Sequence, residues 1–331
     1  MNNTQRYDYI DTLKGGAIIF VVLYHSQFLS LFYIPNSVRP LLFMIISGMF
    51  FRETTSWGEF IKKNFMGLII PYLAYNILCG IEYNALYTCG VNMPVQNLAA
   101  IFYASLPHQL PNTPTWFLPT LFLTSLLFKS IVALTGRLLP RWRIMAIAVV
   151  AFLVGYAGYY IGYRDIHTPL FPEVAFTGIA FYAMGYLFRQ SVGIEYNKSR
   201  DRIGYVLILP ALVAYVMLRG YVSMAENNYA IPYWQLLLMM LSLYVGVFYL
   251  CKWVGKVPLV TYLGRYSLIV LCTHLMVIPL LMGVSLRLFD HNMSVVTTSV
   301  LTLILLRWII VPFCKKYLPI ISGEWMRQKR A

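Results

Sequence analysis

Long apolar stretches, separated by short polar connections, run along almost the whole chain of 331 residues. Unbroken apolar character over about 20 residues is typical of a helix that crosses the hydrocarbon core of a bilayer. The pattern predicts about ten such spans, near residues 12–33, 38–51, 67–87, 115–135, 144–162, 172–188, 203–221, 233–251, 259–283 and 294–313. The expected fold class is an all-α polytopic membrane protein, a single domain over residues 1–331 built as a helical bundle.

A polar connection over residues 56–65 has its own helical pattern. Ser56 and Glu59 have the spacing of a capping box at a helix start. The apolar side chains Trp57, Phe60, Ile61 and Phe65 recur at helical intervals opposite Lys62 and Lys63. This pattern predicts a short amphipathic helix at the membrane interface. Such a helix either anchors the chain to the surface or contributes charge to a site for an anionic ligand.

The longest connection, residues 88–114, contains no Lys or Arg and carries four prolines. We expect a long outer loop, and loops of this length are usually functional or flexible. It leads into Trp116, which is expected at the outer interface. Trp116 either anchors the helix in the aromatic belt of the membrane or supports a site for the acceptor of a reaction.

The charge distribution predicts the orientation of the chain. Only 11% of the residues are charged and 59% are hydrophobic, yet the net charge is +14. With about ten spans, nearly all Lys and Arg fall on one side, and the opposite side holds only Arg39, Arg164, Arg219 and Arg287. By the positive-inside rule both termini are cytoplasmic, in a multi-pass protein of the cell (inner) membrane. The basicity therefore reflects topology, and no nucleic-acid partner is expected. No cleavable signal peptide is expected either, because two aspartates precede the first apolar run.

The candidate chemistry begins on the first predicted helix, where Asp11, Lys14 and His25 fall near one face. At about 100° per residue, Lys14 and His25 lie within roughly 20° of each other and about 16 Å apart along the axis. His25 is expected near the bilayer midplane, where a titratable side chain is costly and usually functional. A neutral imidazole can accept a proton near pH 7, which suits a general base. Asp11 also suits the N-terminal end of a helix, and Lys14 also suits contact with lipid headgroups.

Three further polar residues fall inside predicted spans. His274 lies near the middle of the ninth span and either forms an interhelical hydrogen bond or supports the site. Glu82 lies deep in the third span, where it either pairs within the bundle or binds an acceptor hydroxyl. Ser47 in the second span either lines the site or packs between helices. The five cysteines show no CxxC or Cys/His metal spacing, so buried thiols and no metal are expected.

Several short motifs together resemble one family. They are Arg6-x-Asp8-Tyr-Ile-Asp11-Thr-Leu-Lys14-Gly15, a basic residue with ten intervening positions before His25, Ser47-Gly48, Trp116-Phe117-Leu118, Gly185-Tyr186, and Leu263-Gly264-Arg265-Tyr266-Ser267-Leu268 before His274. Spread over nearly the whole chain, they resemble the membrane acyltransferase-3 family, and within it the fucose 4-O-acetylase-like branch.

This resemblance implies an O-acetyltransferase that moves an acetyl group from acetyl-CoA to a hydroxyl of a surface or exported polysaccharide or glycolipid. His25 matches the essential histidine of the family. Lys14 matches a position often filled by arginine, which keeps the charge but lacks the bidentate fork. On this hypothesis Lys14, Arg52, Lys62 and Lys63 bind the CoA phosphates at the cytoplasmic face, and His25 deprotonates the acceptor or is transiently acylated. The alternative from another class is a transporter or flippase for a glycan precursor or a small solute.

Overall fold

The computed structural model describes residues 7–32, 38–90 and 94–323, which are almost entirely helical. The α-helices of this part of the chain are α1 (Asp8–His25), α2 (Arg39–Met49), α3 (Trp57–Asn64), α4 (Ile70–Thr88), α5 (Ala100–Tyr103), α6 (Phe117–Leu134), α7 (Pro140–Tyr163), α8 (Pro172–Ser191), α9 (Lys198–Val206), α10 (Ile208–Leu218), α11 (Tyr233–Val254), α12 (Pro258–Arg265), α13 (Ser267–Ser285), α14 (His291–Leu305) and α15 (Val311–Tyr317). Shorter 3₁₀ and π turns connect or extend them: η1 (Phe28–Phe32), η2 (Phe65–Ile69), η3 (Pro107–Gln109), η4 (Thr113–Trp116), η5 (Thr135–Arg137), η6 (Met224–Glu226) and η7 (Leu306–Ile310).

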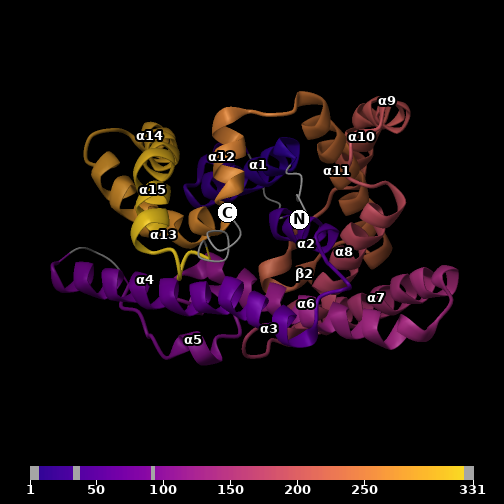
Figure 1. Ribbon diagram of the computed structural model, residues 1–331. Helices are drawn as coiled ribbons and strands as arrows, with labels where there is room; N and C mark the ends of the chain where they lie inside the picture. Colours follow the sequence, from indigo (N-terminus) through magenta and orange to yellow (C-terminus); the bar gives the residue numbers. More distant parts are fainter. Residues whose placement is uncertain (1–6, 33–37, 91–93, 324–331) are drawn as a thin grey trace.

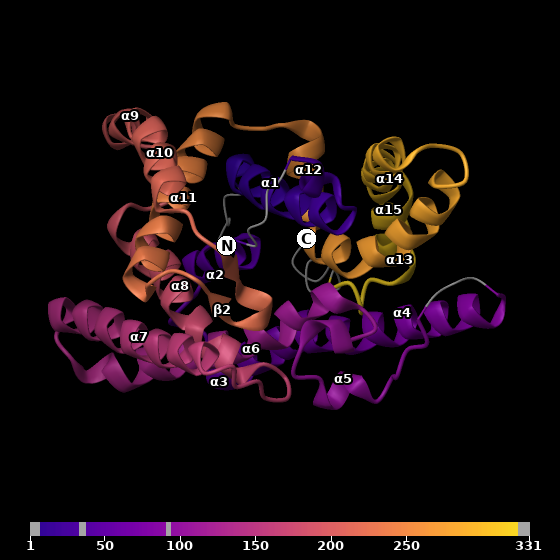
Figure 2. The ribbon, with the colours of Figure 1, turned by 180° about the vertical axis from the view of Figure 1, so that it is seen from behind.

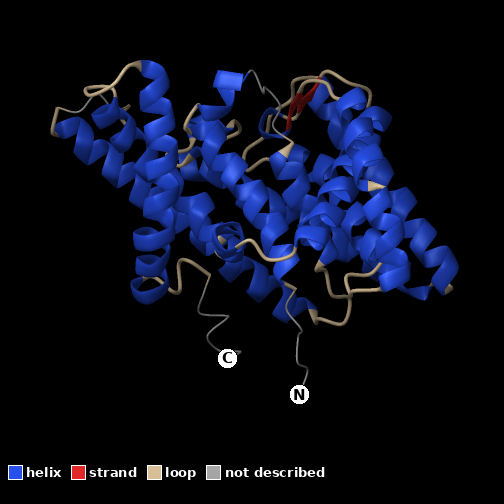
Figure 3. Cartoon of the chain, turned by 90° about the horizontal axis from the view of Figure 1, so that it is seen from above, coloured by secondary structure: helices blue, strands red, loops and turns tan. Residues whose placement is uncertain are grey.

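Strands play almost no part in the described residues. Two strands of two residues each, β1 (Val222–Ser223) and β2 (Asn228–Tyr229), pair antiparallel with Val222 opposite Tyr229. They lie at one edge of the molecule (Figure 3).

Six helical segments of the described residues are long and apolar enough to cross a bilayer. They are Trp57–Thr88, Thr113–Arg137, Pro140–Tyr163, Tyr233–Val254, Ser267–Ser285 and His291–Tyr317. The α9–α10 pair, bent by 41°, gives a seventh if it is counted as one span. The predicted all-α, multi-pass fold is therefore confirmed. The short α2 has only 11 residues, and α1 carries Asp8, Asp11 and Lys14 within its 18 residues.

The helices form two unequal groups (Figures 1 and 2). Helices α4, α6 and α7 follow one another along one side of the molecule. On the opposite side α1 and α12 lie in the centre, with α13, α14 and α15 to one side of them and α9, α10 and α11 to the other. Helices α2 and α8 pack between these groups, and Met44 of α2 and Phe181 of α8 are fully buried in the main core.

Glycines permit two close helix crossings. A Cβ atom added at Gly48 of α2 would overlap the Tyr182 carbonyl of α8, and one added at Gly185 would overlap the Ile45 carbonyl. Gly15 of α1 and Gly264 of α12 permit a close crossing of these two helices in the same way, because a Cβ atom at either would overlap the backbone of the other helix. Small residues at such crossings let helix backbones approach closely, which is how helices associate when lipid surrounds them.

Helix α1 ends earlier than its apolar pattern predicts. The sequence places a span over residues 12–33 with His25 near its middle, whereas α1 runs from Asp8 to His25. Gln27 has a φ of 65°, a left-handed conformation that stops the helix. The Ser26 hydroxyl shares a hydrogen bond of 2.7 Å with the Ser299 hydroxyl of α14, which fixes this end. His25 is therefore the last helical residue and not a central one.

Two other expected elements differ in detail. The expected span over 259–283 is broken at Tyr266 (φ −112°, ψ 29°) into α12 and α13. The described part of the 88–114 connection is folded, because α5, η3 and η4 bury Ile101, Ala104 and Leu110 in the core. The amphipathic helix over 56–65 is present as α3, and the Ser56 hydroxyl accepts from the Glu59 amide at its start. It continues through η2 into α4, and its place at the membrane interface stays a prediction.

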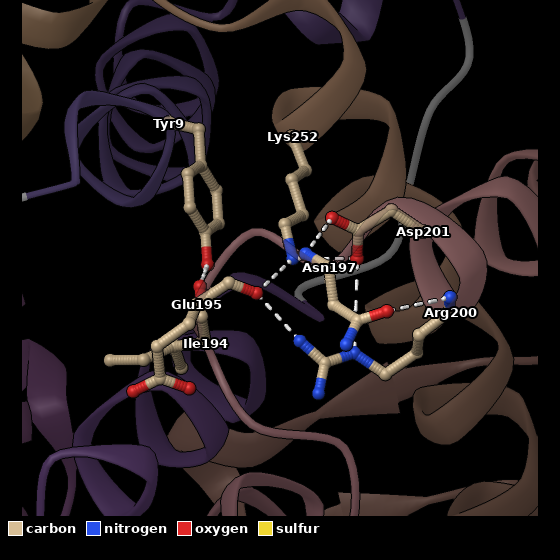
Figure 4. A network of polar contacts seen from close by, with 7 residues as sticks. All are labelled: Tyr9, Ile194, Glu195, Asn197, Arg200, Asp201 and Lys252. Atoms are coloured by element: carbon tan, nitrogen blue, oxygen red, sulfur yellow. Dashed lines mark hydrogen bonds and ion pairs between the residues drawn. The ribbon is translucent and has the colours of Figure 1, made fainter.

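A buried lysine ties the start of α1 to α9 and α11 (Figure 4). Lys252 Nζ donates to Asp201 Oδ1 (2.7 Å) and to the Glu195 carbonyl (2.9 Å). The Tyr9 hydroxyl donates to the Ile194 carbonyl (2.6 Å) beside it, and Lys252 Nζ lies 5.7 Å from the centroid of the Tyr9 ring. The buried charge is thus paired, and the network holds α1 in place relative to the rest of the bundle.

Candidate active site

A cavity of about 590 Å³ passes between α1, α2, α3 and α6 and the connection that precedes α6. Its polar lining residues are Lys14, Tyr24, His25, Arg39, Ser47, Arg52, Thr55, Lys63, Asn64, His108, Thr113, Trp116, Ser125, Tyr182, Ser223, Glu226 and Ser267. The cavity therefore joins most of the predicted site residues in one space.

The two ends of the cavity follow from the pairing of α1 with α2. Lys14 Nζ lies 4.7 Å from the ring centroid of Phe50, just after α2. At the other end, Arg39 Cζ lies 4.3 Å from the ring centroid of Tyr24. Helices α1 and α2 are thus antiparallel. Lys14, with Arg52 and Lys63, marks one end of the cavity, which we call the basic end, and Arg39 marks the other, which we call the far end.

His25 faces the cavity beside a second histidine. Its ring centroid lies 5.1 Å from that of His274 and 5.3 Å from that of Tyr24. His274 is fully buried, and its Nδ1 atom lies 2.8 Å from the Val270 carbonyl. Because a carbonyl only accepts, Nδ1 carries the proton and neutral His274 has its lone pair on Nε2. That Nε2 atom has no hydrogen-bond partner among the described residues.

This geometry can hold a base in a fixed orientation. The unpartnered Nε2 of His274 is an acceptor, and the nearby His25 imidazole offers an N–H donor when neutral. If His25 turns its N–H toward His274, the second nitrogen of His25 is left with a lone pair. A base held by a third group in this way is the arrangement that activates hydroxyl nucleophiles.

A model of the acyltransferase domain matches residues 7–314, which is nearly the whole chain. The chain belongs to the acyltransferase-3 family. Searches of curated proteins and of solved structures find no match. Membership of the family, together with the apolar helices, makes the protein a membrane acyltransferase.

The fold brings together the motifs that carry the family resemblance. Arg265 of α12 lies beside both aspartates of the N-terminal motif, with its Nε 3.7 Å from Asp11 Oδ2 and its Nη2 3.7 Å from Asp8 Oδ1. Thr12 and Thr261 share a hydrogen bond of 2.8 Å at the same crossing. Asp11 is buried and is not among the residues that line the cavity. These residues join α12 to α1 and so place Lys14 and His25.

Four of the predicted site residues are absent from the cavity lining: Asp11, Lys62, Glu82 and His274. Lys62 is exposed and does not line the cavity, whereas its neighbour Lys63 does. Glu82 of α4 is partly buried with an unpartnered Oε2 atom, and it too is absent from the cavity lining. Trp116 is only 5% exposed, and its ring packs against Phe117 and Phe171 in the cavity wall.

A buried pair of asparagines, Asn76 and Asn112, fixes the wall beside His274. The Asn112 amide nitrogen donates to Asn76 Oδ1 (3.0 Å), and Asn112 Nδ2 donates to the Cys272 carbonyl of α13 (2.7 Å). Asn76 Nδ2 donates to Thr115 Oγ1 (2.7 Å), next to Trp116. The connection before α6 is thus bonded to α4 and α13. The sequence features that could have pointed to this pair are one asparagine within an apolar run and a second within a loop that has no charged residues.

The basic end also contains a lysine that the sequence analysis did not single out. Lys129 of α6 is 6% exposed and donates to the Thr55 carbonyl (2.6 Å). Its Nζ lies 4.9 Å from the centroid of the Phe60 ring. Lys129 thereby fixes α3, which carries Lys63 into the cavity lining. A lone lysine in the apolar stretch over 115–135 was the available signal.

Proposed function

We propose that this acyltransferase moves an acetyl group from acetyl-CoA to a hydroxyl of a surface or exported polysaccharide or glycolipid, with His25 as the general base. The observation that carries the proposal is that one cavity joins three cationic side chains at one end to His25, a partly buried histidine at the end of α1. In this proposal the chain crosses the cell membrane ten times with both termini in the cytoplasm, so the basic end faces the acetyl-CoA pool.

The basic end suits the phosphates of acetyl-CoA. Lys14, Arg52 and Lys63 line the cavity there, and cationic side chains form strong, charge-assisted hydrogen bonds with phosphate oxygens. The cavity is long enough to take an extended ligand, since Lys14 and His25 lie about 16 Å apart along α1. Lys62 and Glu82 have no part in this scheme, because they lie outside the cavity lining and, unlike His274, are not placed beside His25.

The reaction needs one proton acceptor beside the reacting carbonyl. His25, oriented by His274, takes the proton from the acceptor hydroxyl. The hydroxyl oxygen forms a bond to the thioester carbonyl carbon as the carbon–sulfur bond breaks. His25 then gives the proton to the departing CoA thiolate, so the base is restored and CoA leaves as the thiol. Ser47 and Trp116, in the wall of the same cavity, contact the acceptor in this proposal.

A transfer assay with purified protein tests the proposal. Protein in proteoliposomes receives acetyl-CoA labelled in its acetyl group, together with an extract of surface glycans. Label should appear in the glycan fraction, and His25→Ala should lower the rate by about 10²–10⁴-fold while the protein still elutes as a folded species. Transport of glycan without label would favour the transporter. Unchanged transfer by folded His25→Ala protein would remove His25 as the base.

A further inference from the structure

Arg39 is a buried cation at the far end of the cavity. It is 6% exposed, and its Nη2 atom is buried without a hydrogen-bond partner among the described residues. The guanidinium carbon lies 4.3 Å from the ring centroid of Tyr24. Arg39 and His25 line the same cavity. From the sequence alone, Arg39 is only one of the few arginines predicted on the outer side.

This position is unfavourable for a positive charge that has no ligand. Burying a charge costs several kcal/mol unless it is paired, and the other buried cations are satisfied, Lys252 by Asp201 and Lys129 by the Thr55 carbonyl. Arg39 is also the first residue of α2, where the helix dipole is positive and favours negative charge. The cation–π contact with Tyr24 stabilises the guanidinium less than a hydrogen-bonded anion would.

The cavity lining offers Arg39 no counter-ion. Glu226 is the one carboxylate among the described residues that line the cavity. It forms no ion pair with Arg39 within the described residues, and Tyr221 donates to its Oε2 atom at 3.4 Å. Within the described residues, Arg39 therefore has no acidic partner, which leaves it available to a bound anion.

We propose that the acyl acceptor is an anionic saccharide and that Arg39 binds its carboxylate or phosphate. This rests on the proposed function, since it assigns the substrate class of that same site. Tyr24 contacts both groups: its ring centroid lies 5.3 Å from that of His25 and 4.3 Å from the Arg39 guanidinium. One saccharide can thus present a hydroxyl to His25 and an acidic group to Arg39, whose planar fork suits two oxygens at once.

Binding of three matched sugars tests the proposal without requiring acyl transfer. Glucose, glucuronic acid and glucose 6-phosphate are titrated into purified protein, and the shift in melting temperature gives each affinity. CoA is present throughout, so that the basic end is occupied. At least one acidic sugar should bind about tenfold or more tightly than glucose, as expected for a charge-assisted hydrogen bond. A preference for glucuronic acid identifies a uronic-acid acceptor, and a preference for glucose 6-phosphate identifies a phosphorylated one.

Variants connect this preference to Arg39. Arg39→Gln should bring the affinity ratio of acidic to neutral sugar close to one, and Arg39→Lys should keep the charge but lose several-fold of the ratio, because lysine has no fork. If Arg39→Gln does not fold, Arg39→Lys still tests whether the affinity ratio depends on Arg39. Arg287→Gln, which removes an exposed arginine away from the cavity, should leave the ratio unchanged.

Two outcomes overturn the proposal. One is equal affinity for glucose and both acidic sugars in the unsubstituted protein. The other is an acidic preference that survives Arg39→Gln. Because the measurement is of binding, an acidic preference that depends on Arg39 would stand even if the labelled-acetyl assay found no transfer, and the two proposals can fail separately.

Discussion

At the scale of single residues, the proposed chemistry depends on the pairing of His25 with His274. Sequence analysis could place both in apolar helices but could not bring them together, because α1 and α13 lie far apart in the chain. The contact depends on α1 ending at His25 and on α13 turning His274 inward, where Nδ1 is satisfied by the Val270 carbonyl. In the proposed mechanism His274 is therefore a positioning residue that acts through His25.

Replacing His274 tests this positioning role. His274→Ala should lower kcat by about tenfold or more and change KM for acetyl-CoA little, because no donor contact is lost. His274→Gln, whose side-chain oxygen can accept where Nε2 did, should recover part of the rate. The acidic limb of the pH–rate profile should persist in both variants, since in the proposed mechanism protonated His25 cannot act as the base. A His274→Ala enzyme with the full rate would contradict the role.

Two adjacent lysines provide a matched test of the basic end. Lys63 lines the cavity and Lys62 does not. Lys63→Met should raise KM for acetyl-CoA by about tenfold, the effect of losing one hydrogen bond to a charged group, with kcat almost unchanged. Lys62→Met should leave both constants as they are. Steady-state kinetics with varied acetyl-CoA checks this, and equal effects of the two substitutions would argue against the cavity as the donor site.

At the scale of elements, the apolar pattern predicted the helices well and their ends poorly. Each of the ten expected stretches overlaps a helix within the described residues, because a long apolar run in a membrane protein has few other structures open to it. Six of the helical segments, or seven with the bent α9–α10 pair, are long and apolar enough to cross a bilayer. The end of α1 at His25 depends on the left-handed Gln27 and on Ser299 of α14. The break at Tyr266 accompanies the packing of α12 on α1. These are tertiary effects that local pattern does not contain.

Neighbouring glycines on α1 test the close crossing with α12. A Cβ atom at Gly15 would overlap the Val260 carbonyl, whereas one at Gly16 meets nothing within 4 Å. Gly15→Ala should destabilise the protein by about 1–3 kcal/mol through overpacking. Gly16→Ala should be neutral or slightly stabilising, because alanine favours helices. Thermal unfolding of the two variants in the same detergent compares them, and equal melting temperatures would contradict the crossing.

At the scale of the whole molecule, the family and the multi-pass fold were predictable from the sequence, while the cavity was not. The motifs lie near both ends of the chain and in its middle, and only folding shows that Asp11 meets Arg265 while Lys14 and His25 share a cavity. Arg39 is the clearest example of a feature that the sequence could not predict. Its charge was visible as a topological signal, but its burial beside Tyr24 required the packing of α1 on α2.

The predicted orientation can be tested through native cysteines. Of the five, Cys89 at the end of α4 is exposed, and Cys79, Cys272 and Cys314 are buried. In the proposed topology Cys89 lies outside, so a membrane-impermeant maleimide should label it in intact cells, and Cys89→Ser should abolish that label. In the Cys89→Ser background, Lys198→Cys at the start of α9 should react only after the membrane is opened. If Lys198→Cys were labelled in intact cells and Cys89 only after the membrane is opened, the orientation would be the opposite one, with the basic end outside.

A structure determined with a non-hydrolysable analogue of acetyl-CoA tests the central claim most directly, since that claim is that one cavity joins the donor end to the base. The account predicts that the analogue phosphates lie against Lys14, Arg52 and Lys63, and that the acyl carbonyl lies beside His25 with room for a hydroxyl on the Arg39 side. An analogue bound outside this cavity, or with its acyl group away from His25, would contradict it.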